Sequence, residues 1–174
     1  IRGGLLYKKA SILTQKLGEQ LFSEHDNIIE KPRLFGAANS ACFDDEGVRT
    51  PEQRDIIKNG VLCGYILGSY TARKLDMKST ANSGGVRNVR VSHGSKSREQ
   101  LLGEMGAGFL VTDLIGSGIS MLTGDYSRGA SGFWVENGEI QFPVEEVTVA
   151  GKLADMFNGI QEIAADSLGR GNIH

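Results

Sequence analysis

Two Asn-Gly dipeptides, each set between β-prone segments, limit the folds open to this chain more than any other feature. Asn59-Gly60 lies within 54–65, and Asn137-Gly138 lies within 131–144. Asn and Gly tolerate the positive φ of a type I′ turn, which joins neighbouring antiparallel strands. The sequence therefore predicts two β-hairpins. Pro143 suits the edge or end of the second, because it has no backbone N–H to donate.

The remaining segments favour short helices and strands joined by irregular stretches. Helices are predicted over 11–22, from leucines at four-residue spacing, over 69–75 behind a Ser cap, over 99–105 behind a Ser-x-x-Gln capping box, and over 151–157. Strands are predicted at 108–115 and 119–123, and one more lies in a mobile loop over 79–97. The stretch 23–50 has no periodicity and is interpreted as a loop with brief extended pieces.

These elements predict an α+β fold, with an antiparallel β-sheet built from hairpins and several short helices. They show none of the βαβ alternation that builds a parallel sheet. A chain of 174 residues can bury the core of one ordinary domain, so we expect a single domain over 1–174. Because its apolar pattern begins at once with Ile1, we expect a fragment of a longer chain.

Charge and cysteine usage exclude several classes of protein. Nineteen basic and 21 acidic residues give a net charge of −2, which does not favour a nucleic-acid partner. Cys42 and Cys63 have no metal-binding spacing and suit a reducing cytoplasm. No apolar run is long enough to cross a bilayer, so a soluble cytoplasmic protein with no membrane partner is expected.

No catalytic or metal-binding motif stands out. A zinc hydrolase usually places two His on one helix face beside a Glu, whereas His25, His93 and His174 are scattered. Asp44-Asp45-Glu46 could attract a hard cation, but a turn-forming acidic loop is the better interpretation. The basic stretch 87–98 lacks an aromatic residue for base stacking and is interpreted as a solvated loop.

The most unusual run is 124–138, which places an acid, a phenol, a hydroxyl and a guanidinium between glycines and beside Phe133-Trp134. Such a loop could grip a peptide backbone, which makes Asp125, Tyr126 and Arg128 the candidate substrate-binding residues. The alternative is a tight turn in which Arg128 pairs with Asp125. No catalytic residue and no metal ligand is assigned.

Together with 139–144 and 147–151, this run resembles the signature of PmbA/TldE-type members of the TldD/PmbA family, also named modulators of DNA gyrase. A second block agrees, formed by 43–50, 54–60 and 70–75. Both blocks have the order and spacing of the family, so the resemblance covers nearly the whole chain and points to the family's carboxy-terminal region.

The resemblance implies a cytoplasmic prokaryotic protein that pairs with a TldD-like subunit in a hetero-oligomeric metalloprotease. Such complexes trim or degrade peptides, including microcin precursors and antitoxins, and peptide maturation is the expected role. In this family the His-Glu-x-x-x-His-type motif belongs to TldD, so zinc is expected in the partner. The substrate would lie extended in a cavity enclosed by two subunits and pair with strand edges.

Two rival functions remain open. The first is an independently active metallopeptidase whose zinc ligands precede Ile1 in a longer chain. The second is a non-proteolytic binding module that acts on DNA gyrase or another regulatory partner.

Overall fold

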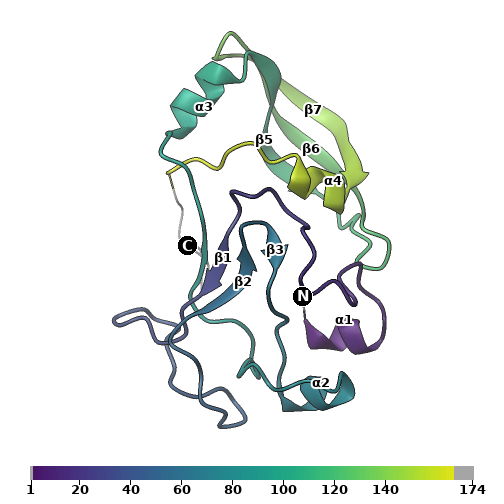
Figure 1. Cartoon of the computed structure of the whole chain (residues 1–174). Helices are drawn as coiled ribbons and strands as arrows, with labels where there is room; N and C mark the ends of the chain where they lie inside the picture. Colours follow the sequence, from purple (N-terminus) through teal and green to yellow (C-terminus); the bar gives the residue numbers. More distant parts are fainter. Residues whose placement is uncertain (1, 167–174) are drawn as a thin grey trace. The chain divides into compact units, whose positions relative to one another are not determined.

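The chain divides into two compact units along its sequence. The computed structural model describes residues 2–166, of which 2–92 form unit 1 and 93–166 form unit 2. Their strands build two antiparallel sheets, accompanied by a few short helices (Figure 1). The predicted α+β class is confirmed, whereas one domain over 1–174 stays a prediction. No helix within 2–166 is long and apolar enough to span a bilayer.

Unit 1 is built around a four-stranded sheet with the order β3-β2-β1-β4. Its elements are α1 (Gly3–Tyr7), β1 (Ile28–Glu30), β2 (Arg54–Lys58), β3 (Val61–Leu62), α2 (Ser69–Lys74) and β4 (Val89–Val91). β2 and β3 form the first predicted hairpin, whose turn residues Asn59 and Gly60 have φ of 48° and 75°. Positive φ at both positions is what a type I′ turn requires, so this prediction is confirmed. β4 is the strand expected within 79–97.

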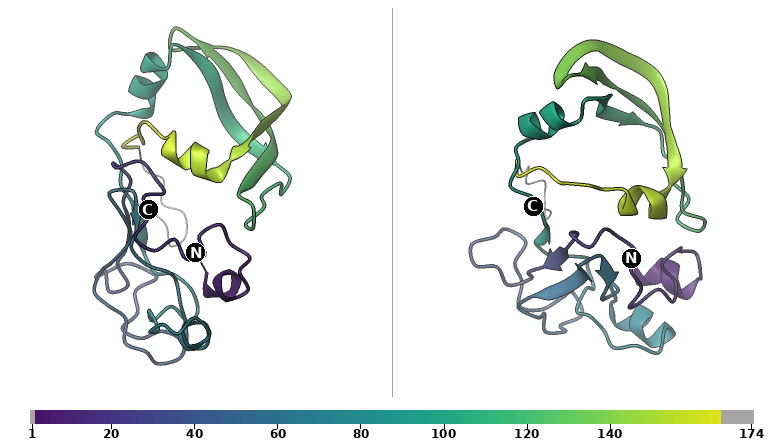
Figure 2. Two further views of the ribbon diagram at one scale, coloured as in Figure 1. Left: turned by 45° about the vertical axis from the view of Figure 1, so that its right-hand side comes forward. Right: turned by 45° about the horizontal axis from the view of Figure 1, so that its top comes forward.

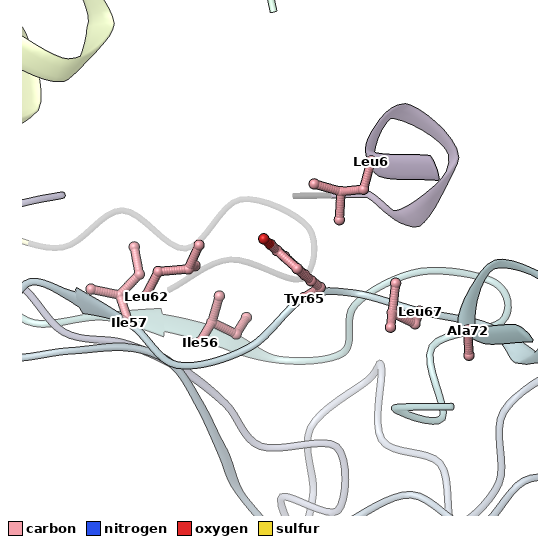
Figure 3. Close-up of a cluster of buried hydrophobic side chains, with 7 residues drawn as sticks. All are labelled: Leu6, Ile56, Ile57, Leu62, Tyr65, Leu67 and Ala72. Atoms are coloured by element: carbon pink, nitrogen blue, oxygen red, sulfur yellow. The ribbon is translucent and has the colours of Figure 1, made fainter. Parts of the chain in front are cut away.

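The hydrophobic core of unit 1 draws on the β2–β3 hairpin, on the segment that follows it and on both helices. Figure 3 shows the buried side chains, which are Leu6, Ile56, Ile57, Leu62, Tyr65, Leu67 and Ala72. Ile57, Leu62 and Leu67 are 0% exposed. Full burial of an aliphatic side chain of this size contributes about 1.5–3 kcal/mol. Side-chain packing therefore holds strands that are too short to be stabilised by their own ladders.

The helix predicted over 11–22 is wrong, because this segment forms successive turns. Ser11 Oγ accepts the Leu13 amide at 3.2 Å, and the Tyr65 hydroxyl accepts the Lys16 amide at 3.2 Å. The same Tyr65 hydroxyl donates to the Leu13 carbonyl at 2.6 Å. These bonds occupy backbone groups that a helix would pair internally. Leu13 and Leu21 still pack against the core without a helix, whereas Leu17 is 39% exposed.

α2 confirms the predicted helix but not its predicted Ser cap. Ser69 is the first helical residue, and Gly68 occupies the N-cap position without a side-chain hydrogen bond. The carboxylate of Glu46 accepts the Ser69 amide at 2.7 Å, and hydrogen bonding from Ser69 lowers the pKa of Glu46. A negative charge suits this helix end, because the helix dipole is positive there.

A buried carboxylate joins three separate parts of unit 1. Glu30 is 1% exposed and makes a short ion pair with Arg54. It also accepts the Asn82 side-chain amide at 2.9 Å and the Arg87 backbone amide at 2.7 Å. Burial lowers the pKa of Arg54, and attraction to Glu30 opposes that shift. Through these bonds, Glu30 of β1 connects β2 with the segment that precedes β4.

Unit 2 is a curved three-stranded sheet with the order β5-β6-β7 (Figure 2). Its elements are α3 (Arg98–Glu104), β5 (Ala107–Ile115), β6 (Asp125–Glu136), β7 (Glu139–Lys152) and α4 (Leu153–Asn158). α3 opens with the predicted capping box of Ser97 and Gln100, and α4 is the last predicted helix. β6 and β7 form the second hairpin, with φ of 52° at Asn137 and 79° at Gly138. The predicted capping box, the last predicted helix and the second predicted hairpin are all confirmed.

The strand predicted over 119–123 is wrong, because this segment is a turn before β6. Ser120 Oγ accepts the Thr123 amide at 3.2 Å, and the Ser120 amide donates to the Asp125 carbonyl at 2.8 Å. Ile119 makes an isolated bridge to Tyr126. Local bonds from a hydroxyl thus override the β-prone composition of the segment.

Candidate functional site

The run 124–138 contains the central strand of unit 2, and it is not a loop between glycines. β6 pairs with β5 on one side and with β7 on the other. Its backbone groups therefore bond to neighbouring strands, as buried backbone groups generally do. The predicted conformation, a gripping loop or a tight turn, is wrong, and any ligand contact from this run must come from its side chains.

The three predicted site residues lie on two faces of the sheet. Successive side chains of a strand point to opposite faces. Tyr126 and Arg128 consequently share one face of β6, and Asp125 lies on the other. The structure brings Tyr126 and Arg128 together and separates Asp125 from both.

Asp125 is held at the start of β6 by a lysine and a threonine. Its carboxylate makes a short ion pair with Lys152 of β7 and accepts the Thr123 hydroxyl. Hydrogen bonds from Lys152, and then from Thr123, lower the pKa of Asp125. The side chain is exposed, so solvent screens this pair.

Arg128 is anchored to the neighbouring strand. Its Nη2 donates to the Leu114 carbonyl of β5 at 2.8 Å. Its Nε is buried and has no acceptor among the residues described. The predicted pair of Arg128 with Asp125 does not form. The guanidinium therefore has donors that no carboxylate of the described chain uses.

The register of the two ladders places three aromatic side chains in one row. Trp134 lies opposite Phe109 of β5 and Phe142 of β7. Opposed residues share a face, and alternation along β6 puts this row on the same face as Tyr126. We call it the Trp134 face; its residues are Phe109, Val111 and Leu114 of β5, Tyr126, Arg128, Ala130, Gly132 and Trp134 of β6, and Phe142, Val144, Val147 and Val149 of β7.

Part of the Trp134 face is open. Phe142 is 54% exposed and Val111 is 38% exposed. At the other end, a Cβ added to Gly151, the partner of Tyr126, would meet Met156 of α4 at 3.4 Å. Large exposed apolar patches on soluble proteins mark interaction sites. The Trp134 face is therefore the candidate site of unit 2, with the aromatic row at its open end.

The sheet also presents two edges. β7 is interrupted by Pro143 and by Glu146, whose φ is 57°. Pro143 thus lies on an edge strand, as predicted. β5 is the other edge; Ala107–Ile115 contains no proline, and its pairing with β6 is regular except for a bulge between Val111 and Asp113. Because unpaired edge groups can bond to an added strand, β5 is the better edge for an extended peptide.

The acidic loop forms a turn, as the sequence indicates. Asp44 is 6% exposed, and its carboxylate accepts the backbone amides of Glu46, Val48 and Ser83. Asp45 pairs with Arg87 at 3.3 Å, while the Glu46 carboxylate caps α2. These carboxylates serve separate partners. Among residues 2–166, no three His, Cys, Asp or Glu side chains gather to hold a metal ion.

The basic stretch 87–98 is divided between the two units and partly neutralised. Lys96 pairs with Glu104 at 2.7 Å and with Glu162 at 2.9 Å, and hydrogen bonds from these carboxylates raise the pKa of Lys96. His93 is exposed, and His174 lies outside the described residues. Arg87 pairs with Asp45 and Arg98 with Glu99, so these basic side chains also have carboxylate partners.

Sequence reasoning missed the aromatic row, although a signal for it was present. Phe133 and Trp134 are neighbours in the sequence, and a strand points neighbouring side chains to opposite faces. Counting outward from the Asn137-Gly138 turn would have paired Trp134 with a residue near Phe142. Phe109 could not be found in this way, because β5 joins the sheet without a short hairpin.

Comparison with known proteins identifies close relatives. The sequence profile of the PmbA/TldA metallopeptidase C-terminal domain matches residues 1–174. Metalloprotease PmbA of Escherichia coli O157:H7 is 51% identical over 173 residues, which cover 99% of this chain and 38% of that protein. The metalloprotease PmbA homolog of Haemophilus influenzae is 48% identical over 174 residues, with the same coverage of 99% and 38%. The chain thus spans well under half the length of these relatives.

Solved structures share the fold. A Bacteroides thetaiotaomicron protein, named as a candidate modulator of DNA gyrase, matches with a TM-score of 0.89 and 33% identity over 95% of this chain and 37% of that chain. TldE from Thermococcus kodakarensis matches with a TM-score of 0.78 and 27% identity, over 94% of this chain and 39% of that chain.

Proposed function

Because this chain belongs to the PmbA/TldD metallopeptidase family, we propose that it is part of a PmbA-type subunit of a cytoplasmic protease that trims or degrades peptides. The subunit acts in a hetero-oligomer with a TldD-like partner, which carries the zinc ion. The observation that carries this proposal is 51% identity to a PmbA metalloprotease over 99% of the chain. Since the chain covers 38% of that relative, the activity proposed is that of the whole protein.

The described residues do not fit a zinc centre. A catalytic zinc site needs about three converging His, Cys or carboxylate ligands. Asp44 bonds to backbone amides, Asp45 pairs with Arg87, and His25 is exposed. We therefore assign no step of bond cleavage to these residues. Activation of a water molecule is the chemistry that zinc would supply from the partner.

In this proposal, unit 2 helps to capture the peptide. The β5 edge offers backbone groups to an extended strand, and the Trp134 face offers apolar surface to its side chains. Tyr126 and Arg128 supply polar contacts on that face. Asp125, on the opposite face, would contact the peptide only where the peptide passes the start of β6.

Cleavage by the assembled pair is the direct test. The full-length protein is mixed with its TldD-like partner and zinc, and hydrolysis of an unfolded peptide is followed by mass spectrometry, with each subunit alone as control. Cleavage by the pair alone supports the proposal. Cleavage by this protein alone would assign it an independent metal site, while no cleavage in any mixture would overturn the protease role.

Separate substitutions test the three lining residues in the active pair. Tyr126→Phe, Arg128→Gln and Asp125→Asn each remove a polar or charged group that is proposed to contact the peptide. Each substitution should raise the KM for the peptide more than it lowers kcat. A variant whose KM is unchanged would remove that residue from the lining.

The names of two structural relatives favour a second candidate, a modulator of DNA gyrase that acts without proteolysis. One is the Bacteroides thetaiotaomicron protein, and the other, from Thermotoga maritima, matches with a TM-score of 0.87 and 35% identity. A pull-down with the full-length protein that retained gyrase but no TldD-like subunit would favour this function. Retention of the TldD-like subunit without gyrase would exclude it.

A further inference from the structure

Three arginines line one pocket in unit 1, together with residues from a later segment of the chain. The pocket has a volume of about 350 Å³, and its lining includes Arg33, Arg49 and Arg54 together with Thr50, Ser79 and Thr80. Arg54 belongs to β2, and Arg33 and Arg49 come from the irregular stretch that precedes it. Arg49 and Arg54 are near neighbours in the sequence, and the fold brings Arg33 and the segment with Ser79 and Thr80 to them.

The positive charge of this pocket is only partly balanced. Arg54 is paired with the buried Glu30, as described above. Arg33 bonds to Thr50 alone, and Arg49 is exposed and has no hydrogen bond or ion pair within 2–166. Glu52 is near in sequence but does not line the pocket. Two guanidinium groups thus lack a carboxylate partner in the described chain.

The pocket is also pre-shaped by internal bonds. Arg33 donates from Nε to the Thr50 hydroxyl at 3.4 Å and from Nη2 to the Thr50 carbonyl. Arg54 Nη1 donates to the Thr80 carbonyl at 3.0 Å, while the Thr80 hydroxyl is engaged with Leu67. Side chains already fixed in this way lose little further freedom when a ligand binds.

We propose that this pocket binds the carboxylate of a peptide, carried either by its C-terminus or by an acidic side chain. The planar fork of a guanidinium matches the two oxygens of a carboxylate. Arg49 supplies the uncommitted donors, and Arg33 supplies a fixed second charge. This inference rests on the proposed function only in taking a peptide as the ligand.

Binding without cleavage separates this inference from the protease proposal. The full-length protein, without zinc and without its partner, is titrated with N-terminally labelled peptides, and anisotropy is measured. One peptide has a free C-terminal carboxylate and no acidic side chain, the second is its C-terminal amide, and the third is that amide with one internal Glu. The first or the third should bind about tenfold more tightly than the second, because a charge-assisted hydrogen bond is worth about 1.5 kcal/mol.

Arg49→Gln is the decisive variant, since Arg49 has no structural bond to lose. It should abolish the tenfold preference for a carboxylate, and the control Arg73→Gln on α2, outside the pocket lining, should keep it. Equal binding of all three peptides, or a preference that survives Arg49→Gln, would overturn the inference. Binding of inorganic phosphate that depends on Arg49, with no peptide preference, would also overturn it. If the assembled pair cleaves no peptide while the carboxylate preference in this binding assay is intact, the protease role alone would be overturned.

Discussion

Unit 1 buries a cluster of apolar side chains although Phe35 and Phe43 are exposed, whereas unit 2 leaves most of its large apolar side chains partly or fully exposed. In unit 1, Ile57 and Leu62 are 0% exposed within one continuous cluster. In unit 2, the buried hydrophobic residues among those described are Ala130 and Val135, while Ile115 is 61% exposed and Phe142 is 54% exposed. Apolar area removed from water stabilises a fold in rough proportion to its size. The two units therefore depend on different sources of stability.

The strands of the two units differ in length, and the unit with fewer buried apolar side chains has the longer strands. β1 and β4 of unit 1 have three residues each, whereas β6 and β7 of unit 2 have 12 and 14. Unit 2 is thus held mainly by long backbone ladders, and unit 1 by packed side chains around a buried ion pair. A surface left apolar by such a ladder is available to a ligand or a partner.

The largest effect is expected at the buried carboxylate of unit 1. Glu30→Ala leaves the Arg54 charge without its partner and should lower the free energy of unfolding of unit 1 by about 3–5 kcal/mol. Hydrogen exchange at the β2 amides measures this loss. Glu52→Ala, an exposed carboxylate in the same unit, is the control and should change little. If the β2 amides were equally protected from hydrogen exchange in Glu30→Ala and Glu52→Ala, the buried ion pair would not be a main source of stability in unit 1.

A matched pair of apolar truncations tests the contrast directly. Leu62→Ala opens a cavity in a packed core and should cost about 2–5 kcal/mol. Phe142→Ala removes a half-exposed side chain and should cost about 1 kcal/mol or less, while raising the KM of the assembled protease. Denaturant unfolding of both variants provides the comparison. A larger loss in Phe142→Ala would show that unit 2 has a packed core after all.

Two glycines of β6 test the importance of the ladder in unit 2. A Cβ at Gly132 would lie 2.0 Å from the Leu110 carbonyl oxygen, whereas a Cβ at Gly129 would lie at an ordinary 3.5 Å from Ile115. Gly132→Ala should therefore destabilise unit 2 by about 1–3 kcal/mol, and Gly129→Ala should not. Fluorescence of Trp134, the only tryptophan of the chain, reports the unfolding of this unit. If Gly132→Ala and Gly129→Ala had similar unfolding midpoints, the stability of unit 2 would not depend on close pairing of its strands.

The smallest effect concerns the exposed ion pair of unit 2. The folded pKa of Asp125 is lowered by Lys152 and Thr123, so its contribution to stability is present above the ordinary pKa of 3.8 and is lost as pH falls through the folded pKa. Lys152→Gln should raise the Asp125 pKa toward 3.8, as followed by carboxyl NMR. Lys152→Arg, which keeps the charge, should leave it low. An unchanged titration in Lys152→Gln would contradict the role of the lysine.

Local sequence was sufficient wherever neighbouring residues decide the conformation. Asn59-Gly60 and Asn137-Gly138 specify their hairpins because these residues accept positive φ within a two-residue turn. Ser97 and Gln100 specify the start of α3, since their side chains satisfy backbone amides of the same turn. These features, together with the family motifs, were sufficient for the fold class and for the family.

Tertiary structure decided the rest, because the deciding partners are distant in sequence. Tyr65 takes backbone groups of 11–22 that a helix would need, and β5 joins β6 to complete the aromatic row around Trp134. The arginine pocket is completed by Ser79 and Thr80, which a later segment without a periodic pattern brings beside Arg33 and Arg54. A sequence specifies which side chains are available, but their convergence depends on long-range packing that no local pattern records.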